Sequence, residues 1–594
     1  MRQHRLAVRA SGLHAGAMGL QPPFVLLDDA RPGGAGARLY RNSVEVVRAE
    51  SPEDVGEALE KLRAARGRGL HAAGWLDYHA ASGVEPRAAA LPGGAPCLWF
   101  GLFERYETVD PMALLPDPAS AWAGAPRPRI SQAHYREQFA RVAGLIAAGD
   151  IYQANLTFRA DVPVLGPPAA LYALLRSRAA AGYGALIATG ERWLLSFSPE
   201  LFFALEGGRL AARPMKGTAL RGSTPEQDAA LAEELGSDPK QRAENLMIVD
   251  LMRNDLGRVA RAGSVAVPRL FEVERYPTVH QMVSSITAEL DAGRDAVDAL
   301  AALFPCGSVT GAPKLRAMEV IAEVEADARG VYTGAIGRLD ANGDAMFNVA
   351  IRTLALEGGK AVLGLGSGVV ADSNADDEWS ECLAKGAFVA AGEAGFDLIE
   401  TMRFDTLAGI ALLERHLARM KASAQAFGFE FDRHAARNEL QAATFRLRTP
   451  ARVRLLLARS GAISIGIAPL PEAAAAPVRV AIRRRQVAPD DFRLAHKTSR
   501  RSIYPRAEGA WETLYTDADG YLTEGSFTSI FVERDGILVT PPLARGVLPG
   551  VLRAELLENG RAVEGDLTAA DLAGGFFLGN ALRGLVSAVT VAEG

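Results

Sequence analysis

Hydrophobic positions along the chain follow two spacings, one typical of strands and one typical of helices. Short β-rich runs occupy 24–27 and 97–103, and a helical stretch lies near 52–66 between them. Further strands and helices interleave as far as about residue 390, where the pattern closes on a strand at 362–366 and a helix at 374–391. The pattern predicts a mixed α/β (α+β) protein.

Two stretches of small and turn-forming residues divide this pattern. Residues 111–129 are rich in proline and alanine and are predicted to be a linker. A helix capped by Ser131 follows it. Residues 390–395 (AAGEAG) predict a hinge, after which a new α/β pattern begins at Phe396. The two parts share no motif, which favours a fusion over a duplication.

Bulk properties exclude several classes of function. A chain of 594 residues is too long for one core, so several domains are expected. A net charge of −5 without a basic block argues against a nucleic-acid surface. No apolar run approaches the roughly 18–20 residues that span a bilayer. Cys97, Cys306 and Cys382 form no C-x-x-C pair, so we expect a cytoplasmic protein without disulfides or a zinc site.

Lysine is rare in this chain, which makes Lys216 a candidate for chemistry. Eight of the 65 basic residues are lysine and the rest are arginine. An amine can lose its proton and attack carbon, whereas a guanidinium stays protonated at ordinary pH. Lys216 directly precedes Gly217 and follows a strand predicted at 210–212. A surface lysine is the competing interpretation.

The residues around Lys216 resemble a family signature. Residues 213–218 are RPMKGT, which is similar to the Pro-Ile-Lys-Gly-Thr motif of aminodeoxychorismate synthase component I, a chorismate-utilising enzyme. Its relative anthranilate synthase typically carries alanine in place of the lysine. The resemblance implies an anthranilate synthase component I-like two-sheet β-sandwich with surrounding helices. Residues 1–125 would be its N-terminal part, and residues 126–391 would be the catalytic domain.

A catalytic set is also implied by the resemblance. Lys216 would attack ring carbon 2 of chorismate, and Glu200, in the motif SPE at 198–200, would move protons beside it. His280 matches a histidine near the leaving hydroxyl. Gln153, counted among the substrate contacts, stands where water-using relatives place a lysine base. Because an amide cannot act as that base, the sequence points to ammonia as the incoming nucleophile.

Metal ligands and substrate contacts follow from the same resemblance. Glu244, Glu378 and Glu381 match the ligands of Mg²⁺, and the spacing of the last two places both carboxylates on one helical face. Without the resemblance they are ordinary solvated helix acids. Arginine and close backbone N–H groups suit a substrate carboxylate. The positions matched to substrate contacts are Thr310, Gly311, Tyr332, Arg352, Gly366, Gly368 and Lys385.

The last part of the chain, 396–594, resembles a second family, the fold-type IV pyridoxal-phosphate enzymes with their two-subdomain α/β fold. Lys497, the only lysine after Lys421, matches the lysine that binds the cofactor, and Glu524 matches the glutamate that faces its pyridine nitrogen. The matched phosphate contacts are Arg419, Gly550, Val551, Leu552 and Asn580. Leu552 stands where many relatives have threonine, so its backbone alone would serve.

Together the two resemblances imply a bifunctional enzyme. Its first part would convert chorismate and ammonia to 4-amino-4-deoxychorismate with Mg²⁺. Its second part would eliminate pyruvate with pyridoxal 5′-phosphate, giving 4-aminobenzoate for folate synthesis. A separate glutamine amidotransferase subunit would supply ammonia, and the second part could form a homodimer.

Two alternatives stay open. One is an anthranilate synthase fused to a fold-type IV aminotransferase, because sequence alone separates lyase from aminotransferase poorly. The other is a degenerate scaffold for an amidotransferase, which would require broken motifs.

Overall fold

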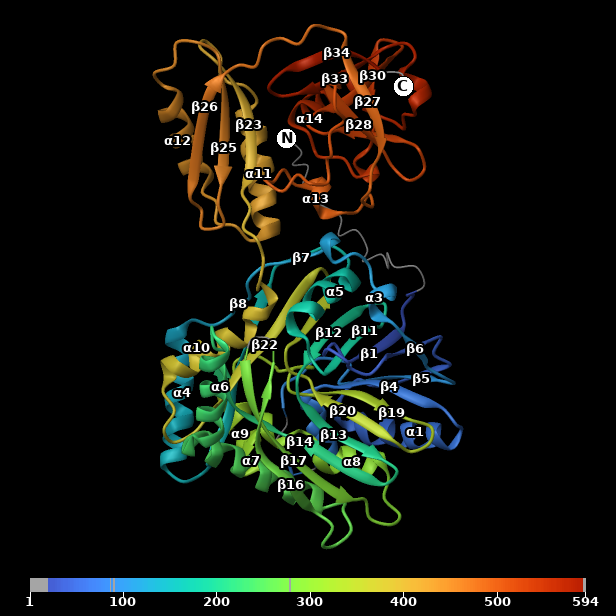
Figure 1. The fold of residues 1–594 in the computed structure, drawn as a ribbon, viewed down its shortest axis with the longest axis vertical. Helices are drawn as coiled ribbons and strands as arrows, with labels where there is room; N and C mark the ends of the chain where they lie inside the picture. Colours follow the sequence, from blue (N-terminus) through green and yellow to red (C-terminus); the bar gives the residue numbers. More distant parts are fainter. Residues whose placement is uncertain (1–19, 86, 89–90, 277–278, 591–594) are drawn as a thin grey trace. The chain divides into compact units, whose positions relative to one another are not determined.

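The chain divides into two compact units, and the computed structural model describes residues 20–85, 87, 88, 91–276 and 279–590. The first unit extends to Pro118 and also includes Ala125–Val162 and Pro167–Gly392. The second unit contains Ala119–Gly124, Pro163–Gly166 and the chain from Glu393 onward. Within each unit, helices pack on β-sheets (Figure 1).

Two large antiparallel sheets form the frame of the first unit. The order of the first sheet is β18 (Gly311–Ala312), β9 (Gln153–Val162), β22 (Lys360–Val369), β21 (Thr353–Glu357), β12 (Arg192–Ser198), β11 (Tyr183–Ala188), β1 (Phe24–Asp28), β2 (Ala37–Arg41) and β6 (Glu107–Val109), with β8 (Arg127–Pro128) beside β9. The order of the second is β15 (Met215–Leu220), β17 (Val279–Glu289), β14 (Arg209–Arg213), β13 (Leu201–Glu206), β20 (Ala345–Val349), β19 (Ala335–Leu339), β4 (His71–Leu76), β5 (Leu98–Phe103) and β3 (Glu45–Ala49), with β16 (Ala266–Arg275) beside β17.

A shared core joins the faces of these two sheets. Val25 of β1 and Ile187 of β11 belong to the same buried cluster as Trp75 of β4 and Ile336 of β19. The Trp75 ring stacks on Trp99 with 5.2 Å between ring centroids. Because these side chains come from both sheets, the apolar face of each sheet is buried against the other. The predicted two-sheet sandwich is therefore confirmed.

Helices complete the first unit. They are α1 (Val55–Gly67), α2 (Ala81–Val84), α3 (Pro111–Leu114), α4 (Gln132–Ala147), α5 (Pro168–Ala179), α6 (Pro225–Ser237), α7 (Pro239–Gly257), α8 (Ala296–Leu303), α9 (Lys314–Val324) and α10 (Ala375–Gly386). Ser131 accepts a hydrogen bond from the His134 N–H at the start of α4, so the predicted cap is confirmed. None of the described helices is both long and apolar enough to cross a membrane.

The second unit contains two larger sheets, each with its own core, and a two-stranded ribbon described below. The smaller sheet has the order β24 (Gly409–Ile410), β23 (Leu398–Asp405), β25 (Ala451–Leu457) and β26 (Ile463–Pro469). The larger has the order β29 (Leu522–Gly525), β28 (Glu512–Thr516), β27 (Val478–Arg484), β34 (Gly584–Thr590), β33 (Phe576–Asn580), β30 (Ser529–Arg534), β31 (Ile537–Thr540) and β32 (Ala562–Glu564). The helices are α11 (Leu413–Phe427), α12 (Arg433–Thr444), α13 (Phe492–Ala495) and α14 (Val551–Glu558).

One segment differs from its prediction as a linker. Within 111–129, β7 (Trp122–Ala123) pairs with β10 (Val164–Leu165) in a ribbon that belongs to the second unit. Trp122 is 1% exposed and lies in the core of the smaller sheet. Proline and alanine dominate the composition of this segment, and its one aromatic side chain, Trp122, packs in the core of the second unit.

Candidate active sites

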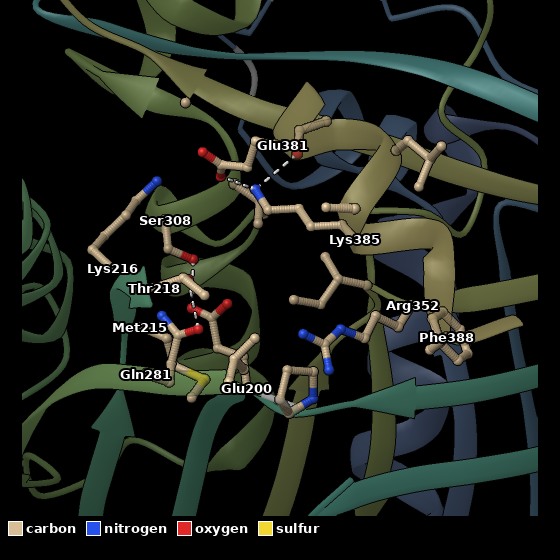
Figure 2. A pocket seen from close by; sticks show the side chains of 18 of the residues that line it. Glu200, Met215, Lys216, Thr218, Gln281, Ser308, Arg352, Glu381, Lys385 and Phe388 are labelled. Carbon is tan, nitrogen blue, oxygen red and sulfur yellow. Dashed lines mark hydrogen bonds and ion pairs between the residues drawn. The ribbon is translucent and has the colours of Figure 1, made fainter. Parts of the chain in front are cut away.

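A cavity of about 570 Å³ in the first unit collects most of the residues singled out there (Figure 2). The predicted site residues that line it are Glu200, Lys216, Glu244, Tyr332, Arg352, Gly366, Gly368, Glu378, Glu381 and Lys385. They come from both sheets and from α7 and α10. A cavity of this size holds a small organic molecule, and its lining carries both carboxylates and the cations Lys216, Arg352 and Lys385.

Lys216 lies at a bulge in β15, where the pairing with β17 shifts register between Met215 and Thr218. Gly217 has φ +89°, which glycine adopts without strain, and the bulge turns the Lys216 side chain into the cavity. Burial lowers the pKa of Lys216 below its ordinary value, and the charge of Lys385 lowers it further. The lowered pKa increases the fraction of free amine, the form that attacks carbon.

Glu200 lies between β12 and β13 and is 3% exposed. β13 pairs with β14 so that Leu201 lies opposite Arg213, and Glu200 and Lys216 line the same cavity. Burial raises the pKa of Glu200 to about 7, while a hydrogen bond from the Ser308 Oγ, 2.7 Å from Oε1, opposes the rise (Figure 2). A carboxyl group with this pKa can accept and return a proton near neutral pH.

Ser308 was not predicted from the sequence. It lies in the 3₁₀ turn Gly307–Val309, far from Glu200 along the chain, and its hydroxyl also contacts the Cys306 Sγ at 3.2 Å. The only signal available was its position two residues before the predicted contact Thr310.

The acidic residues of the cavity were predicted to hold Mg²⁺. Burial raises the pKa of Glu244, and the charge of Glu378 adds to the rise, as expected for neighbouring carboxylates. Glu381 instead pairs with Lys385, 2.6 Å from Oε1 to Nζ. No three His, Cys, Asp or Glu side chains of the described residues enclose a metal site. Mg²⁺ needs only one or two carboxylates with waters, so Glu244 and Glu378 fit it, and the metal stays a prediction.

Arg352 supplies a cation for an acidic ligand. Its φ of +49° lies in the left-handed region, which is costly for a residue with a side chain. The guanidinium lines the cavity (Figure 2), and within the part of the chain that the structure describes it forms no ion pair. Burial lowers the pKa of Arg352. A half-buried cation without a counter-ion among the described residues favours binding of an anion at this position.

Other predicted residues lie outside the lining of the cavity. His280 on β17 is fully buried, and its Nε2 lies 2.8 Å from Asp228 Oδ1 on α6. Gln153 on β9 is 1% exposed, and neither of its amide atoms has a hydrogen-bond partner among the described residues. A Cβ atom on Gly368 would lie 3.0 Å from both Gln153 Nε2 and Lys216 Nζ. The side chains of Gln153 and Lys216 therefore both lie next to Gly368 and close to each other.

Thr310 and Gly311 each contact the backbone of a neighbouring segment. The Thr310 hydroxyl donates to the Cys306 carbonyl at 2.8 Å. Gly311 has φ +150°, and a Cβ atom there would lie 2.2 Å from the Gln153 carbonyl oxygen. A glycine at this position therefore permits the close pairing of β18 with β9.

Lys497 follows α13 in the second unit. Its backbone carbonyl accepts a hydrogen bond from the Ile399 N–H at 2.9 Å, which ties it to β23. Burial lowers the pKa of Lys497 to about 8, and the charge of Arg419 contributes. Because a free amine is needed to form an imine with an aldehyde, this environment fits the predicted bond to pyridoxal phosphate.

Glu524 is held in the core of the same unit. It is 5% exposed and accepts hydrogen bonds from the Tyr504 hydroxyl at 2.7 Å and from the Leu548 N–H at 2.9 Å. Burial raises the pKa of Glu524 to about 7. Such a carboxyl group prefers a cationic partner, and a protonated pyridine ring would be one.

The predicted phosphate contacts also fit that cofactor. Arg419 on α11 donates to the Pro549 carbonyl at 3.1 Å, beside the start of α14. Gly550 caps α14 without a side-chain hydrogen bond, so the first N–H groups of the helix, including those of Val551 and Leu552, remain available for an anion. Asn580 ends β33 and donates to the Phe527 carbonyl at 3.2 Å.

Two buried glutamates of this unit were missed. Glu400 accepts two hydrogen bonds from the Arg419 guanidinium, from Nε to Oε1 at 2.8 Å and from Nη2 to Oε2 at 2.6 Å. Glu512 is fully buried and accepts hydrogen bonds from Ser526 and Thr528, which orders the turn after Glu524. A glutamate in an otherwise buried strand was the available signal for Glu512.

Comparison with known proteins supports the division of the chain into two parts with separate candidate sites. Residues 22–391 match the family described as chorismate binding enzyme, and residues 397–591 match amino-transferase class IV. Aminodeoxychorismate synthase component 1 of Klebsiella aerogenes is 45% identical over 45% of this chain and 58% of its own length. Anthranilate synthase component 1 of Streptomyces coelicolor is 43% identical over 43% of this chain and 50% of its own length.

The matched part of the chain thus covers between half and three fifths of the length of these two curated relatives. The crystal structure of anthranilate synthase component I from Streptococcus pneumoniae TIGR4 matches with a TM-score of 0.52 and 27% identity, covering 66% of this chain and 95% of that one. The family match covers more than half of the sequence and includes the whole cavity. The chain therefore belongs to the chorismate binding enzyme family, and it carries a class IV aminotransferase-type domain after that part.

Proposed function

We propose that the first unit converts chorismate and ammonia to 4-amino-4-deoxychorismate. The observation that carries the proposal is the Lys216 amine, with its lowered pKa, in one cavity with Glu200 and Arg352. Relatives of both product types match the chain to a similar degree. The lysine is what favours this product over anthranilate, since anthranilate synthases typically carry alanine there.

The chemistry divides into two displacements. The Lys216 amine bonds to ring carbon 2 of chorismate, the two ring double bonds each shift by one position, and the hydroxyl at carbon 4 leaves as water after taking a proton. Ammonia then bonds to carbon 4, both double bonds shift back, and Lys216 leaves as the amine. Glu200 accepts the proton released by the attacking nitrogen and returns one to the leaving group, which its pKa near 7 permits.

Other residues bind and orient the substrate. Arg352 would bind a substrate carboxylate. Glu244 and Glu378 would hold Mg²⁺, which supplies positive charge for the acidic substrate when bound. Gln153 beside Lys216 is an amide and cannot deprotonate water, so ammonia reacts in preference to water.

We further propose that the second unit is 4-amino-4-deoxychorismate lyase, releasing pyruvate and 4-aminobenzoate. Pyridoxal 5′-phosphate, when bound, would supply an electron sink. Lys497 would hold the cofactor, then remove a proton from the substrate and return one to the departing three-carbon fragment. Glu524 would face the pyridine nitrogen, and Arg419 with the start of α14 would bind the phosphate.

Association of the two units in one chain supports a lyase over an aminotransferase, because such a lyase consumes the product of the first reaction. A non-catalytic scaffold is less well supported. It would not require half-buried Lys216 and Lys497 side chains whose amines have lowered pKa values and lie near carboxyl groups.

The source of nitrogen tests the proposal. With chorismate, Mg²⁺ and an ammonium salt, the purified chain should form 4-aminobenzoate and pyruvate in equal amounts. With glutamine in place of ammonium it should form neither, because Cys97, Cys306 and Cys382 are all buried and burial raises their pKa values, which disfavours a thiolate nucleophile. A separate amidotransferase should restore the use of glutamine. Formation of 2-aminobenzoate as the main product would favour anthranilate synthase instead.

Ser308→Ala should impair the first reaction by removing the hydrogen bond to Glu200. Because that bond lowers the pKa of Glu200, its loss should move the acid limb of the kcat profile to higher pH. One lost hydrogen bond to a buried carboxylate predicts about a tenfold lower kcat at pH 7. Ser308→Thr keeps a hydroxyl and should retain the parental limb. If the acid limb of the kcat–pH profile did not shift in Ser308→Ala, Ser308 would have no role in setting the pKa of Glu200.

A further inference from the structure

The core of the second unit includes a side chain from far earlier in the sequence. Trp122 in the β7–β10 ribbon pairs with Leu165 across the strands. Its indole is 1% exposed, and Nε1 has no hydrogen-bond partner among the described residues. Trp122 is therefore held by packing and by the Arg459 guanidinium, which lies over the ring at 5.6 Å.

A short path of ring contacts leads from Trp122 towards Lys497. The Trp122 ring meets Phe427 edge-on, with 5.0 Å between centroids and 84° between planes. Phe427 meets the His496 ring with 4.8 Å between centroids and 65° between planes. His496 directly precedes Lys497. Edge-to-face contacts of this kind have a defined geometry, so each ring restricts the place of the next.

The same path reaches the predicted phosphate site through α11. Phe427 is the last residue of α11, and this helix also carries Arg419 and Ser423. The Ser423 hydroxyl lies 3.0 Å from His496 Nδ1. Burial lowers the pKa of His496 to about 4, so its ring is neutral at physiological pH. The imidazole is thus fixed by one hydrogen bond and one ring contact.

We propose that Trp122 is a positioning residue of the second active site, setting the place of Lys497 through Phe427 and His496. The proposal rests on the proposed role of Lys497 and goes beyond it. It makes the second site depend on a ribbon encoded within the first half of the sequence. A chain beginning at Glu393 would lack both Trp122 and Leu165.

Loss of the indole should change the surroundings of Lys497. Trp122→Ala leaves a space beside Phe427, and the end of α11 can move into it. Water can then approach the segment around His496. Because burial is the main cause of the lowered pKa of Lys497, rehydration should raise that pKa.

The test follows cofactor binding by the full-length chain after the cofactor has been removed. The rate of binding of added pyridoxal phosphate is measured against pH, since only the free amine reacts. We expect the midpoint of this profile to rise by about one pH unit in Trp122→Ala. Hydrogen exchange of the cofactor-free chain should speed up in peptides covering 413–427 and 492–499.

Two matched variants separate positioning from general stability. Leu440→Ala removes a buried side chain of the same core on α12, outside the ring path, and should lower the melting temperature without moving the midpoint. Trp122→Phe keeps an aromatic edge and should restore the parental midpoint. If Trp122→Ala does not fold, Trp122→Leu replaces it, with the same expected shift. A midpoint in Trp122→Ala, or in Trp122→Leu where that variant replaces it, equal to that of Leu440→Ala overturns the proposal.

Failure of the proposed function would look different. A parent chain that binds no pyridoxal phosphate would refute the cofactor role of Lys497. Hydrogen exchange still decides the packing claim in that case. Faster exchange at 492–499 in Trp122→Ala but not in Leu440→Ala supports it, and equal exchange in the two variants overturns it.

Discussion

Replacing Lys216 by alanine should abolish formation of 4-amino-4-deoxychorismate, lowering the rate of chorismate amination by roughly a thousandfold or more. The amine is the only group in the cavity lining assigned to attack carbon, and its loss removes the covalent step. Elimination of pyruvate from supplied 4-amino-4-deoxychorismate should continue at the parental rate, because Lys497 belongs to the other unit. Chorismate consumption and product formation, followed by chromatography, provide the measurement.

Two comparison variants sharpen this result. Lys216→Arg keeps the positive charge but cannot supply a free amine, so it should be as inactive as Lys216→Ala. Lys61→Ala changes an exposed lysine on α1 that pairs with Glu57, and it should behave as the parent. Activity retained by Lys216→Arg would assign Lys216 a binding role. Any aromatic product left in Lys216→Ala is expected to be 2-aminobenzoate, since alanine is the residue of anthranilate synthases.

Most residues of the first site were predicted from the family resemblance, and local sequence explains how some of them are placed. Lys216 follows β14 with a glycine behind it, and a glycine at a bulge turns the neighbouring side chain. Glu378 and Glu381 share a helical face by their spacing alone. The two-sheet sandwich was predicted from a family resemblance, and the buried cluster that joins both sheets confirms it.

What was missed depends on contacts between distant segments. Ser308 meets Glu200 across 108 positions of the chain, and His280 meets Asp228 across 52. A single sequence carries no record of such pairs, so neither the hydrogen bond from Ser308 to Glu200 nor the contact of His280 with Asp228 was predicted. No packing role was predicted for Trp122, because the proline and alanine residues around it indicated a linker.

Replacing Lys497 by alanine should stop the reaction after its first stage. Chorismate should be consumed at the parental rate, 4-amino-4-deoxychorismate should accumulate, and neither pyruvate nor 4-aminobenzoate should form above about a thousandth of the parental rate. The purified variant should also lack the visible absorbance band of lysine-bound pyridoxal phosphate. Lys421→Ala is the matched control: it is the other lysine of the described second unit, is exposed, and lies on α11.

Mixing the two inactive variants tests whether the units work in sequence. Lys216→Ala retains an intact second unit, and Lys497→Ala retains an intact first unit. Both are full-length, so each keeps the Trp122 ribbon that a truncated second unit would lose. If 4-amino-4-deoxychorismate leaves the first site, the mixture should form 4-aminobenzoate after a lag that shortens as the amount of Lys216→Ala increases. Release of pyruvate and 4-aminobenzoate by Lys497→Ala alone, at the parental rate, would show that the second unit is not the lyase. An assay with amino donors and keto acids would then test it as an aminotransferase.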